Sequence, residues 1–181
     1  MGITSIIIDG YNVIGTIHKN LEKMREELID DLCKYERVKG HDVTVVFDGY
    51  KSNFHQSWGQ RGGIEVVYSG HGEDADTLIK RIIKAAKKRY IVITSDRDIA
   101  AFAWANNCVP VRAEVFVRKM KQVAGNCAAK PESLPDSVSF YDNIAYDYEC
   151  DEDDRVLKSK KGNPRSLSKK DKIIKNALDK L

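Results

Sequence analysis

A chain of 181 residues with 42% hydrophobic and 31% charged residues has the composition of a soluble globular protein made of one domain and a tail. No apolar run approaches the roughly 20 residues that a membrane span needs, which excludes a transmembrane protein. The net charge of +3 is unevenly distributed: residues 136–154 hold eight acidic residues and no Lys or Arg, and residues 155–181 hold ten Lys or Arg against two Asp.

The first half of the chain alternates between strand and helix patterns. Residues 3–8 contain a continuous apolar run, which is typical of a strand buried on both faces. Apolar residues at helical spacing then run from 19 to 39, and Gly40 ends that helix. The pattern next predicts a strand at 43–47, a glycine-containing loop at 49–63 and a strand at 64–68.

The second half continues the alternation. Helices are predicted at 74–88, 97–106 and 113–124, with strands at 91–94 and 108–112. Strands that are separated by helices require right-handed crossovers, which give a parallel sheet with helices on both faces. We therefore expect a three-layer α/β fold with a mostly parallel sheet of about five strands.

The pattern fades after Gly125. We expect a domain at residues 1–125, followed at 126–181 by an acidic linker and a basic C-terminal tail that is partly disordered, with a short helix beginning at Ser166 or Ser168. A mildly basic body with a basic end suits a protein that binds a polyanion, although a solvated tail has the same composition. The four cysteines lack paired metal spacing and no signal-peptide pattern is visible, so we expect a cytoplasmic protein.

Carboxylates stand where the predicted strands end. Asp9 follows three isoleucines, Asp96 and Asp98 follow the strand at 91–94, and Asp76 opens the helix at 74–88. Asp48 also follows a strand and is the weakest candidate, because Asp before Gly is an ordinary turn. Ligands of an open α/β sheet bind outside the carboxyl ends of its strands, so these acids are expected to converge. Converging carboxylates repel one another unless a divalent cation is present, and such oxygen ligands suit Mg²⁺ or Mn²⁺.

A purely structural interpretation is available for each acid. Asp9 would cap the turn that begins at Gly10, and Asp96 or Asp98 would cap a helix start. Capping accounts for one of the last two aspartates, and it does not account for both together with Asp9 on a separate strand. The functional interpretation is therefore preferred.

The motifs that carry these acids resemble the YacP-like branch of the NYN family, which belongs to the PIN-like nucleases. They are Ile7-Ile8-Asp9-Gly10-Tyr11-Asn12, Val46-Phe47-Asp48-Gly49, Asp74-Ala75-Asp76 and Thr94-Ser95-Asp96-Arg97-Asp98. The resemblance covers residues 3–124 and implies a PIN-like α/β fold and metal-dependent endoribonuclease activity. It also implies an acidic site of Asp9, Asn12, Asp76 and Asp96, with Asp98 as a fifth member. Because this branch includes ribosome-associated mRNA cleavage, single-stranded mRNA and the ribosome are the expected partners.

The expected chemistry is hydrolysis of an RNA phosphodiester. Mg²⁺ or Mn²⁺ held by Asp9, Asp76, Asp96 and Asp98 activates a water for in-line attack and leaves a 5′-phosphate and a 3′-hydroxyl. Asn12 is expected to orient the water or the phosphate.

Basic and aromatic residues close in sequence to the strand ends are the expected RNA contacts. They are Lys51, Trp58, Arg61, Arg97 and Arg112. Trp58 would stack on an unpaired base, an interaction worth about 1–3 kcal/mol per base. It would equally well pack on the edge of the sheet.

Other functions fit less well. A phosphatase of the haloacid dehalogenase type needs a second Asp two residues after the first, where this chain has Tyr11. A response-regulator receiver needs a late-strand Lys that the pattern does not place. A PIN-like module that binds RNA or the ribosome without cleaving remains the alternative.

Overall fold

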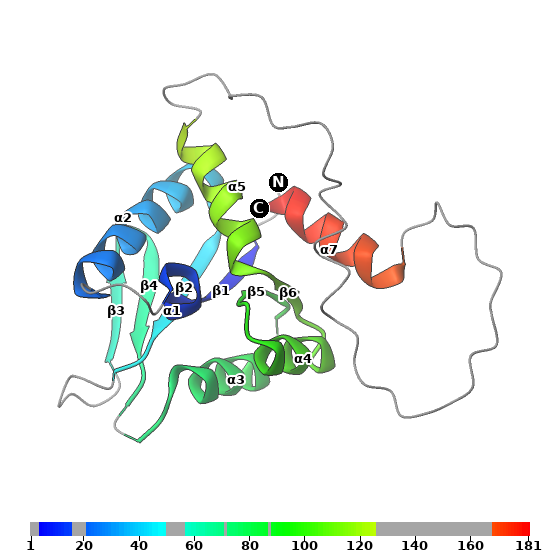
Figure 1. Cartoon of the computed structure of the whole chain (residues 1–181), viewed down its shortest axis with the longest axis horizontal. Coiled ribbons are helices and arrows are strands. Elements are labelled where there is room, and N and C mark those ends of the chain that lie inside the picture. Colours follow the sequence, from blue (N-terminus) through cyan, green and yellow to red (C-terminus); the bar gives the residue numbers. More distant parts are fainter. Residues whose placement is uncertain (1–3, 16–20, 50–56, 71, 87, 126–167) are drawn as a thin grey trace.

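Within the described residues, six strands form one sheet in the order β3-β4-β2-β1-β5-β6 (Figure 1). The computed structural model describes residues 4–15, 21–49, 57–70, 72–86, 88–125 and 168–181. The strands are β1 (Ser5–Asp9), β2 (Asp42–Phe47), β3 (Ser57–Arg61), β4 (Ile64–Tyr68), β5 (Tyr90–Ile93) and β6 (Val109–Val111). All neighbouring strands run parallel except the edge pair β3–β4. This confirms the predicted α/β fold with a mostly parallel sheet.

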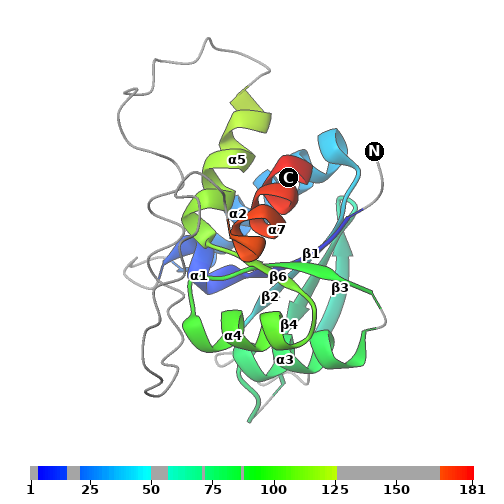
Figure 2. The same ribbon diagram turned by 90° about the vertical axis from the view of Figure 1, so that its right-hand side faces the viewer.

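Helices cover both faces of the sheet. They are α1 (Gly10–Ile14), α2 (Leu21–Lys39), α3 (Ala75–Ala85), α4 (Arg97–Ala105), α5 (Ala113–Gly125) and α7 (Lys169–Lys180). In Figures 1 and 2, α1, α2, α5 and α7 lie on one side of the sheet and α3 and α4 on the other. The arrangement is the three-layer sandwich that the sequence predicts.

The central strands β1, β2 and β5 are buried on both sides, which explains their largely apolar sequences. Ile6 and Ile8 on β1 belong to the core cluster under α2 and α5, whereas Ile7 between them belongs to the cluster under α3 and α4. All three are fully buried. Successive side chains of a strand point to opposite faces, so a central strand with two covered faces needs apolar residues at every position.

The prediction of a loop over 49–63 is wrong for residues 57–61, which form β3. Every residue of β3 is exposed, so the strand has no apolar alternation to recognise. It forms because Gly62 and Gly63 both adopt positive φ, +56° and +92°, in a two-residue turn that returns the chain along β4. Such a turn favours glycine at both central positions. The five-residue α1 was also not predicted, since it is too short to show helical periodicity.

The predicted C-terminal helix is present and packs on the domain. Ser168 caps α7 in a capping box with Asp171. The residues of α7 and its end that enter the core are Ile174, Ala177, Leu178 and Leu181. The buried Tyr35 hydroxyl donates to the Leu181 carbonyl at 3.0 Å. The folded core thus includes the end of the chain, while the division at residue 125 stays a prediction and the acidic stretch 136–154 lies outside the described residues.

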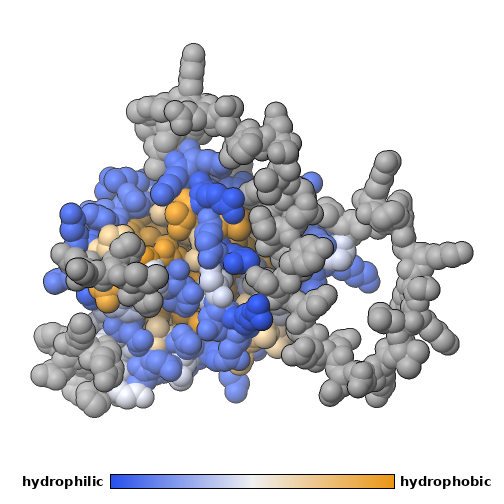
Figure 3. All heavy atoms as spheres, in the orientation of Figure 1, coloured by the Kyte–Doolittle hydropathy of each residue, from blue (hydrophilic) through white to orange (hydrophobic). Residues whose placement is uncertain are grey.

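The face seen in Figure 1 is mostly hydrophilic, and apolar atoms show between the polar ones over the region of α1 and α2 (Figure 3). The partly buried apolar residues of these two helices are Tyr11, Val13, Leu21 and Met24. No helix in the part of the chain that the structure describes is long and apolar enough to cross a bilayer.

The topology fixes where a ligand can bind. From the central β1 the chain goes first to β2 on one side, and it later returns to β5 on the other. The carboxyl ends of β1, β2 and β5 therefore meet at one edge, at the point where the strand order reverses. Open α/β sheets bind their ligands in the crevice at this point.

Candidate active site

Asp9 is the last residue of β1 and is held in a single orientation. Its side chain is 3% exposed. The backbone N–H of Asn12 donates to Oδ1 at 3.2 Å, and the Asn12 side-chain amide donates to Oδ2. Thr94 at the end of β5 donates its hydroxyl to Oδ2 at 3.3 Å. Asp9 thus caps α1 through Oδ1, as the structural interpretation expects. Its Oδ2 accepts from Thr94, which follows a different strand, β5.

The electrostatic state of Asp9 reflects this burial. Burial raises the pKa of Asp9, the hydrogen bonds from Asn12 and Thr94 lower it, and the nearby negative charge of Asp96 raises it further, with a net rise. A buried carboxylate with a raised pKa at the end of a strand is typical of a functional group.

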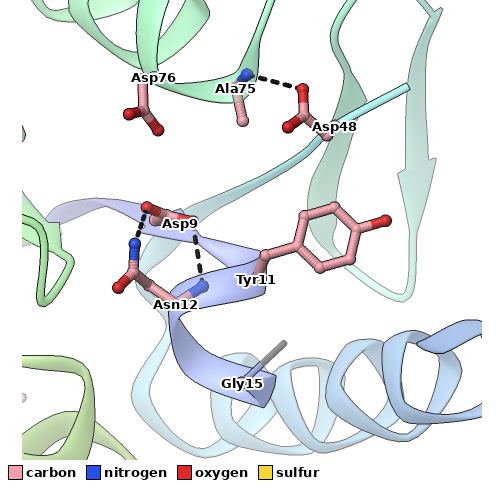
Figure 4. Close-up of a pocket in the computed structure, with 7 residues that line it drawn as sticks. All are labelled: Asp9, Tyr11, Asn12, Gly15, Asp48, Ala75 and Asp76. Carbon is pink, nitrogen blue, oxygen red and sulfur yellow. Dashed lines mark hydrogen bonds between the residues drawn. The ribbon is translucent and has the colours of Figure 1, made fainter. Parts of the chain in front are cut away.

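A pocket of about 230 Å³ opens beside Asp9 (Figure 4). Its lining residues are Asp9, Tyr11, Asn12, Gly15, Asp48, Ala75 and Asp76. Figure 4 shows Asp76, from the first turn of α3, pointing across the pocket toward Asp9, while the Tyr11 ring turns away from both. Three carboxylates therefore line this pocket: Asp9 at the end of β1, Asp48 directly after β2 and Asp76 on α3.

Asp76 carries a raised pKa as well. The causes are burial first and then the negative charges of Asp9, Asp96 and Asp74, against a smaller opposing effect of Lys80. The Asp76 carboxylate makes no hydrogen bond with any described residue. Burial and the neighbouring negative charges thus disfavour the ionised form of Asp76, and a cation in the pocket would relieve the repulsion between the carboxylates.

Asp96 stands at the adjacent helix start and is linked to Asp9 through Thr94. Its Oδ1 accepts from the backbone N–H groups of Asp98 at 2.7 Å and Ile99 at 3.0 Å, so Asp96 caps α4. Its own N–H donates to the Thr94 hydroxyl at 3.1 Å. Thr94 is fully buried and joins the two acidic segments. Asp96 does not line the pocket, but its charge acts on both Asp9 and Asp76.

Asp48 belongs to this site more firmly than its sequence suggested. Its Oδ1 accepts from the Ser69 hydroxyl at 3.1 Å and from the backbone N–H of Ala75 at 3.0 Å. It thereby fixes the start of α3, which carries Asp76. The following Gly49 is required, because a Cβ there would lie 2.2 Å from the Ser69 carbonyl oxygen. Asp48 is the weakest candidate from the sequence, on its place at the end of the strand next to β1, whereas no role was predicted for Thr94.

The structure places Asp98 differently from the other acids. Its side chain is 80% exposed and forms an ion pair with Lys80 of α3. No described contact brings it to Asp9 or into the pocket lining. Asp98 therefore stands on the rim, beside the site that Asp9, Asp76 and Asp96 form.

The predicted RNA contacts are dispersed. Arg61 pairs with Glu26 and Asp30 of α2 and lies opposite Ile64, at the end of β4 away from the acidic edge. Trp58 is 51% exposed on the edge strand.

The remaining predicted contacts do not add a cluster at the pocket. Arg112 lies 3.5 Å from a Glu114 carboxylate oxygen through its Nε, and Arg97 is the first residue of α4. Lys51 lies outside the described residues. None of the described candidates lines the acidic pocket.

The donor set of the pocket fits a hard divalent cation in an open site. Among the described residues, no three His, Cys, Asp or Glu side chains are close enough to hold an ion together. Mg²⁺ does not need such a cage, since it keeps several waters and binds through one or two carboxylates and substrate phosphates. Burial first, and then nearby negative charge, raises the pKa of both Asp9 and Asp76, and a cation would favour their ionised forms.

Comparisons with known proteins agree with this fold and these motifs. The sequence model of the YacP-like NYN domain matches residues 6–144. An uncharacterized protein YacP of Bacillus subtilis (strain 168) is 28% identical over 87 residues, covering 44% of this chain and 51% of that protein. The chain thus matches about half the length of that curated relative.

Two crystal structures of Rae1 (YacP) from Bacillus subtilis have a similar fold. One, of a mutant, gives a TM-score of 0.56 at 22% identity, covering 68% of this chain and 79% of that chain. The other gives a TM-score of 0.55 at 23% identity, covering 70% and 78%. At these identities the likeness establishes a shared fold.

Proposed function

This chain belongs to the YacP-like NYN domain family, and from that premise we propose that it is a metal-dependent endoribonuclease that hydrolyses phosphodiester bonds of single-stranded RNA. The observation that carries the proposal is the meeting of Asp9, Asp76 and Asp96 at the carboxyl edge of the sheet, with Asn12 beside them. The charge of Asp96 raises the pKa of Asp9, and the charges of Asp9 and Asp96 raise the pKa of Asp76. Helix capping accounts for Asp9 and Asp96, but it does not account for this repulsion or for Asp76. The arrangement of the three carboxylates is explained by a ligand that brings positive charge.

Asp9 and Asp76, which line the pocket, would hold Mg²⁺ or Mn²⁺, and Asp96 would act on the ion through its bound waters. When bound, the ion would lower the pKa of a water and neutralise charge that develops on the phosphate. Asn12 and Thr94 fix the Asp9 carboxylate, so its oxygens are preorganised for the ligand. The Asp96 carboxylate is anchored by the backbone of α4 in the same way.

We extend the proposal to mRNA as the substrate, the ribosome as a partner and the cytoplasm as the compartment, on the family resemblance. The mildly basic body and the ten basic residues in 155–181 support a polyanionic partner. Five of those basic residues are on α7, which packs on the domain. A polyanion bound to the domain can therefore also contact this helix.

A PIN-like module that binds RNA without cleaving it is the second candidate function. It is favoured by one observation, the lack of a closed group of three metal-binding side chains among the described residues. Such a module would bind RNA equally well with and without divalent ions and would tolerate loss of Asp9.

The test is cleavage of end-labelled single-stranded RNA with Mn²⁺ or Mg²⁺. We expect cutting that EDTA, Asp9→Asn and Asp96→Asn each abolish, with products that carry a 5′-phosphate. The matched control is Asp179→Asn, which removes the same charge from an exposed position on α7. Metal-independent cutting, or full activity in both site variants, contradicts the proposal. RNA binding without cutting, on free RNA and on translating ribosomes, supports the binding module.

A further inference from the structure

Arg25 on α2 is a cation that aromatic rings hold in place. Its guanidinium carbon lies 5.9 Å from the Phe47 ring centroid and 5.5 Å from that of Tyr68. Its Nε is buried and makes no hydrogen bond, and the guanidinium forms no ion pair with any described carboxylate. Arg61 on β3, by contrast, is paired with two carboxylates of the same helix α2. The terminal nitrogens of Arg25 thus remain as donors for a ligand.

This guanidinium lies beside the acidic pocket. Tyr11 lines the pocket, and its ring contacts Phe47 edge to face at 5.6 Å between centroids. Phe47 in turn stacks on Tyr68 at 5.8 Å. Burial raises the pKa of Tyr11, and the positive charge of Arg25 is the largest effect that opposes the rise. Arg25 therefore acts on Tyr11, a residue that lines the acidic pocket.

A second pocket of about 260 Å³ also has Tyr68 in its lining. It is lined by Glu26, Ile29, Ser57, Trp58, Gly59, Gln60, Arg61, Val66 and Tyr68. The strand register explains why it is hollow.

Ser57 lies opposite Tyr68 and Gly59 opposite Val66, so β3 presents small side chains on the face covered by α2. Trp58 lies opposite Val67, whose side chain packs under α3, so the register places the Trp58 ring on the other face. We call this hollow the β3 pocket.

We infer that Arg25 and the β3 pocket form a nucleotide subsite for single-stranded RNA, in which Arg25 binds a backbone phosphate and the β3 pocket receives the base of that nucleotide. This inference rests on the proposed function, because it takes the acidic pocket as the place of the scissile phosphate. A planar guanidinium matches a phosphate with two parallel hydrogen bonds. The Glu26 carboxylate in the β3 pocket does not compete, since it is already paired with Arg61.

The subsite also meets an electrostatic need. The acidic pocket repels a polyanion, and its described lining contains no Lys or Arg. The positive charge of Arg25 would compensate for that repulsion by binding the RNA phosphate next to the one in the acidic pocket. The strand would then run from the acidic pocket past Tyr11 and Tyr68 to the edge strand β3.

The first test is binding of a fluorescently labelled single-stranded RNA in EDTA, followed by anisotropy over a range of KCl concentrations. We expect Arg25→Gln to weaken binding about tenfold, as for loss of one charge-assisted contact. We also expect the slope of log K against log salt to fall by about 0.7, the value for one phosphate of a single strand. Arg25→Lys should keep the slope and bind less tightly than the wild type, since Lys keeps the charge and loses the planar fork.

The control on the same helix is Arg37→Gln, which removes an equal charge from an exposed position about three turns further on. It should keep the wild-type slope. Thermal unfolding of each variant reports whether loss of the ring contacts has altered the fold.

A second variant tests the β3 pocket without altering any charge. A Cβ at Gly59 meets only the Val66 carbonyl oxygen, at 4.0 Å, so Gly59→Val fits the strand and fills the hollow. It should weaken RNA binding about tenfold with an unchanged salt slope, as for loss of one base contact. Val38→Ala is the uncharged control: Val38 is 65% exposed on α2 and does not line the β3 pocket, so this variant should bind as the wild type does.

The outcomes separate this inference from the proposed function. Wild-type cleavage with unchanged binding and slope in Arg25→Gln and Gly59→Val overturns the subsite and keeps the nuclease. RNA binding that depends on Arg25 and on the β3 pocket, without any cleavage, keeps the subsite and overturns the nuclease. A wild type that neither binds nor cuts single-stranded RNA overturns both.

Discussion

The hydroxyl of Thr94 donates a hydrogen bond to Oδ2 of Asp9 at 3.3 Å, across 85 residues of sequence. The hydroxyl oxygen of Thr94 in turn accepts a hydrogen bond from the backbone N–H of Asp96 at 3.1 Å. One buried hydroxyl therefore sets the position of the end of β1 relative to the start of α4. The separation of Asp9 from Asp96, on which any shared ligand depends, is fixed by Thr94.

Thr94→Val is therefore expected to impair both the site and the fold. Valine has nearly the same shape, so the change removes the hydroxyl and leaves the Asp96 N–H without its partner. We expect a loss of about 1–3 kcal/mol in the free energy of unfolding. Cleavage should fall by about 10- to 100-fold, because small misplacements of catalytic groups have effects of that size. Urea unfolding and the RNA cleavage assay measure the two effects.

The matched control is Thr44→Val on β2. Thr44 is also buried, and its hydroxyl donates to Glu65 at 3.0 Å on a part of the sheet without site residues. It should lose about 0.5–1.5 kcal/mol of stability and keep its cleavage rate. Equal loss of activity in both variants would show that Thr94 acts through general stability and has no specific role in positioning.

The order of the elements could be predicted from the sequence because buried parallel strands and amphipathic helices leave strong patterns. Residues 64–68 are the strand as predicted, and Gly40 ends α2 with φ +63°. β3 could not be recognised, since all of its residues are exposed and its pairing depends on the Gly62-Gly63 turn. An exposed edge strand shows no alternation of apolar and polar residues, so it can be predicted only from the turn that follows it.

The candidate site was predictable to the extent that it lies at strand ends. Asp9, Asp76 and Asp96 come within electrostatic range of one another as the topology requires. The role of Asp48 depends on its contact with the Ala75 N–H, and the isolation of Arg25 from acids depends on packing between α2 and β4. Such long-range pairings have no signature in local sequence.

Divalent ions are expected to stabilise the protein through the acidic pocket. A ligand that binds only the folded state raises stability by RT ln(1 + [L]/Kd), or about 2.7 kcal/mol at a hundredfold excess over Kd. Mn²⁺ should therefore raise the Tm of the wild type. Asp9→Asn and Asp76→Asn should lose most of that rise, whereas Asp98→Asn should keep it, because Asp98 pairs with Lys80 on the rim.

Differential scanning fluorimetry with and without Mn²⁺ measures these shifts, and it needs no RNA. A Tm shift that survives in both Asp9→Asn and Asp76→Asn would place the ion elsewhere. A shift lost in Asp98→Asn would restore Asp98 to the ligand set.

Asp74 and Asp76, at the start of α3, should affect the pH dependence of the free energy of unfolding in opposite directions. Burial and then the charges of Asp9 and Asp96 raise the pKa of Asp76, so its ionised form destabilises the fold above that pKa. The destabilisation is relieved as the pH falls through the folded-state pKa. In EDTA at pH 7, Asp76→Asn should raise the Tm by about 1–3 °C, and the difference should vanish below the unfolded-state pKa of about 3.9.

Asp74 provides the opposite case. Hydrogen bonds from Thr77 lower the pKa of Asp74, whose Oδ1 accepts the Thr77 N–H at 2.8 Å as the cap of α3. Its ionised form stabilises the fold above the unfolded-state pKa, and this contribution is lost as the pH falls through the folded-state pKa. Asp74→Ala should therefore lower the Tm at pH 7 and have less effect in acid. The same sign for both variants would contradict the charge repulsion inferred for the pocket.

The C-terminal helix α7 should contribute to the stability of the domain, although it follows the long stretch 126–167. Leu178 is buried in the core cluster, whereas Ile173 on the same helix is 43% exposed. Leu178→Ala is expected to cost about 2–5 kcal/mol in the free energy of unfolding, as for other buried leucines. Ile173→Ala should change stability by no more than about 0.5 kcal/mol, the usual range for surface positions. Urea denaturation measures both, and equal, small effects would show that α7 does not pack on the domain in solution.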